Sequence, residues 1–233
     1  MPFTKQKIRE LYGRRARHYD CTDNLYYLIG FREMVYRKKA VAGLRLQPGD
    51  TVLEIGCGTG LTLGLLQEAV GPQGRIIGVD LTEEMLDQAR KRIEREGWSN
   101  VELVHQDAAE LEFPLELDGI ISTFALTLIP EYDEIIERGT AALSPGRRFV
   151  AADLKLPNNW IARLAPILVP LVRPFGVTLD PTHWHPWDSM AKFLENLTVE
   201  EFYFGFACIA VGEAPSSSKN IIGSRTCAVA LAV

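Results

Sequence analysis

The residues best placed for chemistry lie where Glu54 precedes three glycines at alternate positions, Gly56, Gly58 and Gly60. An apolar run leads into this stretch, and a helical pattern begins at Leu61. Glycines at this spacing let the backbone take positive φ and let a ligand approach it closely. The helix N-terminus behind the glycines adds free N–H groups. We therefore interpret the stretch as a nucleotide-binding turn.

The spacing of the glycines argues against a dinucleotide. The fingerprint G-x-G-x-x-G would place a glycine at position 61, which is leucine. The carboxylate of Glu54 would repel a pyrophosphate, whereas it suits a ligand with an ammonium or sulfonium charge. S-adenosylmethionine carries both charges. An ordinary glycine-rich turn between strand and helix is the alternative interpretation.

Further polar residues follow later apolar runs. Asp80 lies 20 residues after Gly60, where an acid that ends a second strand can bind ribose hydroxyls, although Asp80 or Thr82 could also cap the following helix. Asp107 ends the next run, and it either accepts a hydrogen bond from an adenine amino group or is a solvated loop acid. A fourth run, 117–126, ends in small hydroxyl residues and an aromatic.

These motifs resemble those of the class I S-adenosylmethionine-dependent methyltransferases, in particular the small-molecule branch with the ubiquinone/menaquinone C-methyltransferases and the phospholipid and betaine-lipid N-methyltransferases. The resemblance covers residues 12–213 and rests on VLEIGCGTG, GVDLTEEML, VHQDAAELEFP, LDGIISTFALTLIP and ALSPGRRFVAADLK, in that order. It implies the cofactor S-adenosyl-L-methionine, held by Tyr19, Glu54, Gly56, Cys57, Gly58, Gly60, Asp80, Leu81, Met85, Asp107, Ala108, Ser122 and Thr123.

The resemblance implies in-line transfer of a methyl group to a small or amphiphilic acceptor, such as a quinone precursor, a lipid headgroup or a natural product. Aminocarboxypropyl transfer and a non-catalytic cofactor-binding subunit are alternatives. Such transfer depends mainly on alignment of the reactants, and a base is needed only for a protonated acceptor.

The candidate catalytic residues are His183, His185 and Tyr19. The histidines could instead belong to a loop that caps the next helix. Tyr19 resembles a tyrosine that closes over the methionine part of the cofactor, and helix packing is its alternative role. We predict no metal site, because a lone H-x-H with Asp180 is a weak signal.

The chain of 233 residues, with 47% apolar and 24% charged residues, fits a soluble α/β protein. Five predicted strands alternate with helices, which is typical of a parallel Rossmann-like sheet with helices on both faces. The strands are expected at 51–56, 75–80, 101–105, 117–123 and 147–154, the last after a turn at 144–146, with a closing hairpin at 200–204 and 206–213. The resemblance implies seven strands in the order 3-2-1-4-5-7-6, the seventh antiparallel.

The predicted domains are an N-terminal helical cap at 1–46, with helices at 4–19 and 23–45, and a methyltransferase domain at 47–214. Within it, a lid insertion is expected at about 157–198, and a tail of no assigned role follows at 215–233. The apolar stretch 160–175 contains two arginines and three prolines and could be a lid over an apolar acceptor, core packing or a dimer interface. We expect a monomer or homodimer.

Charge is unevenly distributed along the chain. The net charge is −5, but residues 1–45 hold eleven Lys/Arg and four acids, a balance of +7, which leaves −12 for the remainder. A basic, aromatic-rich N-terminus suits peripheral contact with anionic membrane headgroups, although a helical cap over the cofactor with a solvated outer face is the favoured interpretation. The overall acidity disfavours nucleic acid as a partner. The sequence has no spanning segment, secretory signal or C-x-x-C pair, which predicts a cytoplasmic location.

Overall fold

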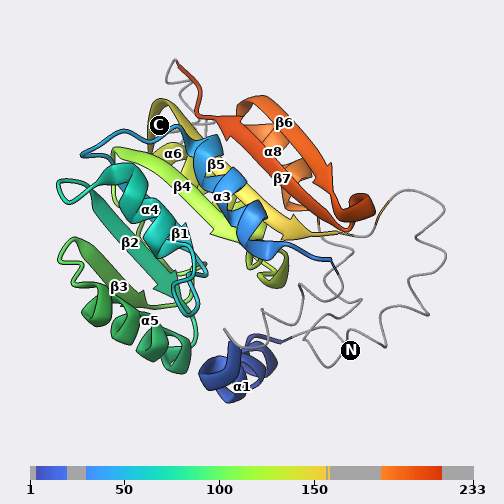
Figure 1. Ribbon diagram of the computed structural model, residues 1–233. Helices are drawn as coiled ribbons and strands as arrows, with labels where there is room; N and C mark the ends of the chain where they lie inside the picture. Colours follow the sequence, from blue (N-terminus) through green and yellow to red (C-terminus); the bar gives the residue numbers. More distant parts are fainter. Residues whose placement is uncertain (1–3, 20–29, 156, 158–184, 217–233) are drawn as a thin grey trace, which may run out of the picture.

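The computed structural model describes residues 4–19, 30–155, 157 and 185–216. A seven-stranded sheet runs through the molecule in the order β3-β2-β1-β4-β5-β7-β6, which confirms the predicted order (Figure 1). Strands β1 to β5 pair in parallel, and β7 is antiparallel to both β5 and β6. The strands are β1 (Thr51–Ile55), β2 (Arg75–Asp80), β3 (Val101–His105), β4 (Leu117–Thr123), β5 (Leu143–Leu154), β6 (Glu195–Phe202) and β7 (Ala207–Glu213).

Helices cover both faces of this sheet, as predicted (Figure 1). Helices α3 (Glu33–Leu44), α4 (Leu63–Val70) and α5 (Glu83–Glu96) contribute to one core cluster. Helices α6 (Tyr132–Ala142) and α8 (Pro186–Phe193) contribute to the other. At the N-terminus, α1 (Lys5–Arg15) is followed by the short 3₁₀ turn η1 (Ala16–His18), and both contact α5.

The apolar strand runs are continuous because the sheet is buried on both sides. In β1, Val52 packs in the cluster under α3 and α4, whereas its neighbour Leu53 packs in the cluster under α6. In β4, Ile121 packs in the cluster under α3 and α4, and its neighbour Ile120 packs in the cluster under α6. Successive side chains of a strand point to opposite faces, so a strand covered on both faces needs an apolar residue at every position.

Strands β5 and β6 differ from the prediction by more than one residue. Strand β5 begins at Leu143, so the segment 144–146 that we predicted as a turn lies within the strand, where Gly146 has φ +74° and the pairing with β4 shifts register. Strand β6 covers 195–202 instead of 200–204, and 203–205 forms the 3₁₀ turn η7. β6 is an edge strand with mostly exposed residues. It therefore lacks the apolar period that reveals a strand in sequence.

One helix and part of one strand lie within the range 157–198 of the predicted lid insertion. Residues 186–193 form α8, in which Met190 is fully buried beside α6, and 195–198 belong to β6. The stretch 158–184, the segment 23–29 of the predicted second N-terminal helix and the tail from 217 lie outside the described residues. Within the described part of that predicted helix, 30–45, α3 begins only at Glu33. Within the described part of the chain, no helix is long and apolar enough to cross a membrane.

Candidate active site

The turn after β1 contains the predicted glycines, all with positive φ. Gly56, Gly58 and Gly60 have φ of +70°, +54° and +79°. The N–H of Gly56 donates to Val79 O at 2.8 Å, which joins the turn to the end of β2. A Cβ at Gly56 would lie 2.3 Å from the Cβ of Ala125, whereas a Cβ at Gly58 would meet nothing within 4 Å. Packing therefore requires glycine at 56, while Gly58 faces open space.

That open space is a cavity at the carboxyl ends of β1, β2 and β4, next to α1. The strand order reverses at this point, because β2 lies on one side of β1 and β4 on the other. Ligands of parallel α/β sheets usually bind at such a switch point. Most of the predicted residues line the cavity, namely Tyr19, Gly56, Cys57, Gly58, Asp80, Leu81, Met85, Asp107, Ala108 and Thr123. The predicted residues Glu54, Gly60 and Ser122 do not line it. Gly60 packs against Leu63, and Glu54 and Ser122 are fully buried.

Asp80 holds the turn and the next helix together. Its Oδ2 accepts from the N–H of Gly58 and its Oδ1 from the N–H of Thr82, both at 2.8 Å. Burial raises the pKa of Asp80, while these two backbone hydrogen bonds act in the opposite direction. Thr82 is the N-cap residue of α5, but its side chain makes no capping hydrogen bond. Asp80 therefore has a structural role at the helix start, and its oxygens retain lone pairs for a ligand.

Asp107 is paired with a residue that sequence reasoning did not identify. Its Oδ1 accepts from the N–H of Ala109 at 3.0 Å, and its Oδ2 lies 2.7 Å from Nζ of Lys5. Lys5 also lies 2.9 Å from a carboxylate oxygen of Glu131 and lines the cavity itself. The contact of Asp107 with adenine stays a prediction. The structure shows that the ammonium group of Lys5 lies beside the Asp107 carboxylate. No local signal could have revealed this partner, because Lys5 comes from the far N-terminal helix.

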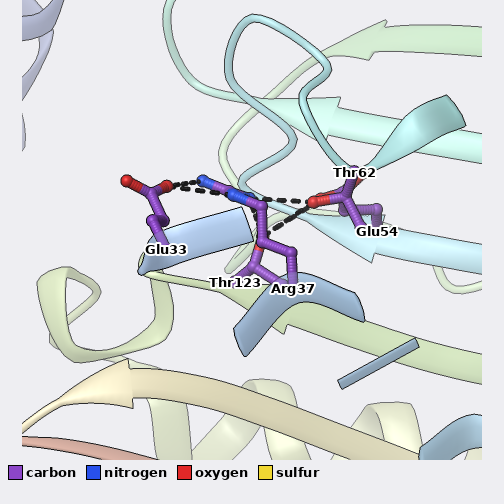
Figure 2. A network of polar contacts seen from close by, with 5 residues as sticks. All are labelled: Glu33, Arg37, Glu54, Thr62 and Thr123. Atoms are coloured by element: carbon purple, nitrogen blue, oxygen red, sulfur yellow. Dashed lines mark hydrogen bonds and ion pairs between the residues drawn. The ribbon is translucent and has the colours of Figure 1, made fainter. Parts of the chain in front are cut away.

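Glu54 belongs to a buried polar network beside the cavity (Figure 2). The hydroxyl of Thr123 donates to its Oε1 at 3.3 Å, and its Oε2 has no hydrogen-bond partner within the described residues. Burial raises the pKa of Glu54 to about 7, although Arg37 and neighbouring hydroxyls lower it. The carboxylate is thus held beside the glycine turn but behind its surface.

Arg37 of α3 belongs to the same network (Figure 2). Its guanidinium donates to Glu33, to Thr123 and, at 2.8 Å, to Thr62. Arg37 is buried and lines the cavity. Sequence reasoning counted Arg37 within a basic segment and gave it no individual role. The helical periodicity of α3 could have distinguished Arg37 from the other basic residues of this segment. Arg37 is on the buried face of the helix, whereas Arg32 and Lys38 are exposed.

Aromatic and apolar residues form another wall of the cavity. Tyr12 of α1 and Tyr19 have ring centroids 6.2 Å apart, and burial raises the pKa of Tyr12 to about 12. Phe124, at the end of β4, has φ +58° and lies with its ring centroid 5.2 Å from the guanidinium of Arg37. Non-glycine residues seldom adopt this conformation, and those that do cluster at functional sites. Leu128 and Ile129 continue the wall.

The predicted histidine bases are not brought to this cavity by the described structure. His185 precedes α8 and packs edge-on against Trp187, with ring centroids 5.1 Å apart, and it does not line the cavity. His183 lies outside the described residues. Among the residues that the structure describes, no group of three or more His, Cys, Asp or Glu could hold a metal ion.

Comparisons with known proteins agree with this geometry. Residues 52–146, which run from β1 into β5, match the family model described as a methyltransferase domain. The crystal structure of an S-adenosylmethionine-dependent methyltransferase from Aquifex aeolicus has the same fold, with a TM-score of 0.56 and 18% identity over 76% of this chain and 89% of that one. Residues 52–146 are therefore similar to methyltransferase domains, and the chain shares the fold of S-adenosylmethionine-dependent methyltransferases.

Curated relatives of this chain share a common name. A demethylmenaquinone methyltransferase of Listeria welshimeri is 30% identical over 156 residues, which cover 66% of this chain and 65% of that protein. A protein of the same name from Bacillus cereus (strain ATCC 10987 / NRS 248) is 26% identical over 235 residues, covering 91% of this chain and 98% of that protein. The match to the Listeria protein thus spans just under two thirds of its length.

Proposed function

We propose that this chain transfers the methyl group of S-adenosylmethionine to a small amphiphilic acceptor. One observation carries the proposal. The same cavity is lined by the glycine turn, by the carboxylates of Asp80 and Asp107 and by an aromatic wall. The carboxylates suit a cationic nucleoside, and the apolar wall suits an acceptor with a large apolar moiety.

The residues present fit the proposed cofactor. Gly58 leaves space where a side chain would intrude, and the buried Oε2 of Glu54 lacks a partner within the described residues, as expected beside a cationic ligand group. Asp80 and Asp107 would hold the ribose and the adenine, and the Gly56–Gly60 turn would let the ligand approach the backbone. The bound cofactor supplies an already activated methyl group on a positively charged sulfur.

The chain's own contribution is then alignment and exclusion of water. Tyr12, Tyr19 and Phe124 close one side of the cavity and limit the directions from which an acceptor can approach. The described cavity lining contains no histidine. Acceptors that are already nucleophilic, such as the ring carbon of a reduced quinone or a neutral amine, therefore suit it best.

We assign the acceptor to the class of reduced, prenylated quinones that lack a methyl group. The support is the name shared by the curated relatives together with the apolar character of the cavity wall. A lipid headgroup amine is the second candidate within the same mechanism. Aminocarboxypropyl transfer and cofactor binding without turnover are the competing functions.

Product analysis separates these functions. The purified chain would be incubated with S-adenosylmethionine and either a reduced demethylated naphthoquinone or vesicles that contain phosphatidylethanolamine. Methyl transfer yields S-adenosylhomocysteine and an acceptor heavier by one methylene, whereas aminocarboxypropyl transfer yields methylthioadenosine. Cofactor binding in a calorimeter without either product would favour the non-catalytic function and refute ours.

A membrane surface is the proposed location of the reaction, on the cytoplasmic side. Helix α3 carries the exposed Val35 and Lys38, and the exposed Arg32 and Arg45 flank its two ends. Near its start, Phe204 of η7 is 71% exposed, and the neighbouring Tyr203 contacts Phe31, with ring centroids 5.3 Å apart. Basic side chains beside exposed apolar ones suit anionic headgroups.

Truncation cannot test this proposal, since α3 buries Ala40 and Leu44 in the core. Charge reversal can. Arg32→Glu with Lys38→Glu should abolish salt-sensitive cosedimentation with phosphatidylglycerol vesicles. Lys91→Glu with Arg95→Glu on α5 changes the net charge equally and should leave it intact. Equal binding by both double variants would refute the surface.

A further inference from the structure

The cavity contains a buried cation whose position suits one end of the cofactor. Arg37 comes from α3, outside the matched domain at 52–146, and is only 4% exposed, yet it lines the cavity with Thr123 and Gly56. A guanidinium is costly to bury unless its hydrogen bonds are satisfied. The hydrogen-bond partners of Arg37 therefore show which of its N–H groups remain for a ligand in the cavity.

The donors of Arg37 are almost fully occupied by the protein. A guanidinium has five N–H donors. Nε and one hydrogen of Nη2 donate to Glu33, and Nη1 donates to Thr62 and Thr123. These bonds fix the guanidinium at the cavity, and within the described residues they leave one hydrogen of Nη2 for a ligand acceptor.

The surrounding charges are complementary to a zwitterion. The acid side chains of the network are Glu33, which is 6% exposed, and Glu54, which is fully buried with Oε2 unpartnered within the described residues. Arg37 is paired directly with Glu33 but has no ion pair with Glu54. The network thus offers a carboxylate for an ammonium group and a guanidinium for a carboxylate, on neighbouring side chains (Figure 2).

We propose that Arg37 recognises the α-carboxylate of the cofactor's amino-acid end, while Glu33 keeps the guanidinium in position. This inference rests on the proposed cofactor and makes Arg37 the residue that distinguishes the complete cofactor from nucleosides without a carboxylate. The remaining N–H can form one charge-assisted hydrogen bond with a carboxylate oxygen. The buried setting strengthens the interaction.

Calorimetric binding tests the proposal without turnover. The ligands are S-adenosylhomocysteine, its decarboxylated analogue, which keeps the amine, and methylthioadenosine, which lacks the whole amino-acid end. The native chain should bind S-adenosylhomocysteine roughly 10- to 100-fold more tightly than the decarboxylated analogue, the range expected for a charged hydrogen bond. Arg37→Met should remove that preference and leave the affinity for methylthioadenosine unchanged.

Arg148→Met is the matched control. Arg148 is also largely buried and paired with a glutamate, Glu213, but it does not line the cavity. The Arg148→Met variant should be less stable than the native chain and should keep the full preference for S-adenosylhomocysteine over its decarboxylated analogue. Arg37→Lys, which retains the charge, should keep part of that preference.

The possible failures are distinguishable. If the native chain binds S-adenosylhomocysteine and the decarboxylated analogue equally, the role of Arg37 is refuted whether or not any variant folds. An equal loss of affinity for both ligands in Arg37→Met refutes it as well. If the native chain binds none of the ligands, the cofactor itself is wrong and the proposed function fails.

Discussion

Cofactor binding should be coupled to the release of a proton from Glu54. Burial raises the pKa of this carboxyl group to about 7, so about half of the molecules carry it protonated at pH 7. The groups that act on it are Arg37 of α3, Thr62, Thr123 of β4 and Asp80 of β2. A ligand ammonium placed beside Glu54 favours the charged form and lowers its pKa.

The magnitude follows from this value. If binding ionises Glu54 fully, roughly half a proton is released per cofactor at pH 7, and the affinity falls about tenfold between pH 8 and pH 6. Titration of S-adenosylhomocysteine in buffers of different ionisation enthalpy measures the proton count directly. Glu54→Gln keeps the shape of the side chain, so the ratio of native to variant affinity cancels the titration of the ligand.

That ratio should change with pH, and a constant ratio from pH 6 to pH 8 would refute the reasoning. Stability provides an independent readout. Because the carboxyl pKa is raised on folding from 4.5 to about 7, the native state binds more protons than the unfolded state between these values. Native stability relative to Glu54→Gln should therefore fall from pH 4 to pH 8, by up to about 3 kcal/mol.

Further predictions concern the turn and α1. Asp80→Ala should weaken S-adenosylhomocysteine binding by about 1.5–3 kcal/mol for each charged hydrogen bond lost, and unchanged calorimetric affinity would exclude the ribose role. Gly56→Ala should lower the thermal unfolding midpoint, since its Cβ would lie 2.3 Å from that of Ala125, whereas Gly58→Ala should mainly weaken ligand binding. The reverse ranking would contradict the geometry of the turn. Lys5→Met should raise cofactor affinity by freeing Asp107, and a loss measured by calorimetry would show that Lys5 itself contacts the ligand.

Strand and turn positions were predictable wherever local pattern and burial coincide. Buried β1 and β4 each contain consecutive apolar residues, Val52–Leu53 and Ile120–Ile121, and the glycines of the turn suit its positive φ. The edge strand β6 was misplaced because its side chains are mostly exposed, so no apolar period marks it. The start of β5 was misplaced because a glycine within an irregular strand resembles a turn.

By itself, the sequence determined the strand order, through its resemblance to a known class. It also determined the acids at the ends of β2 and β3, because these features depend on residues close together in the chain. Only the tertiary structure decided which distant groups those acids meet. Lys5 is paired with Asp107 across 102 positions, the difference of their residue numbers. Arg37 lies beside Glu54 because α3 packs over β4 and β5. Such pairings depend on how helices pack on the sheet, and no local periodicity encodes them.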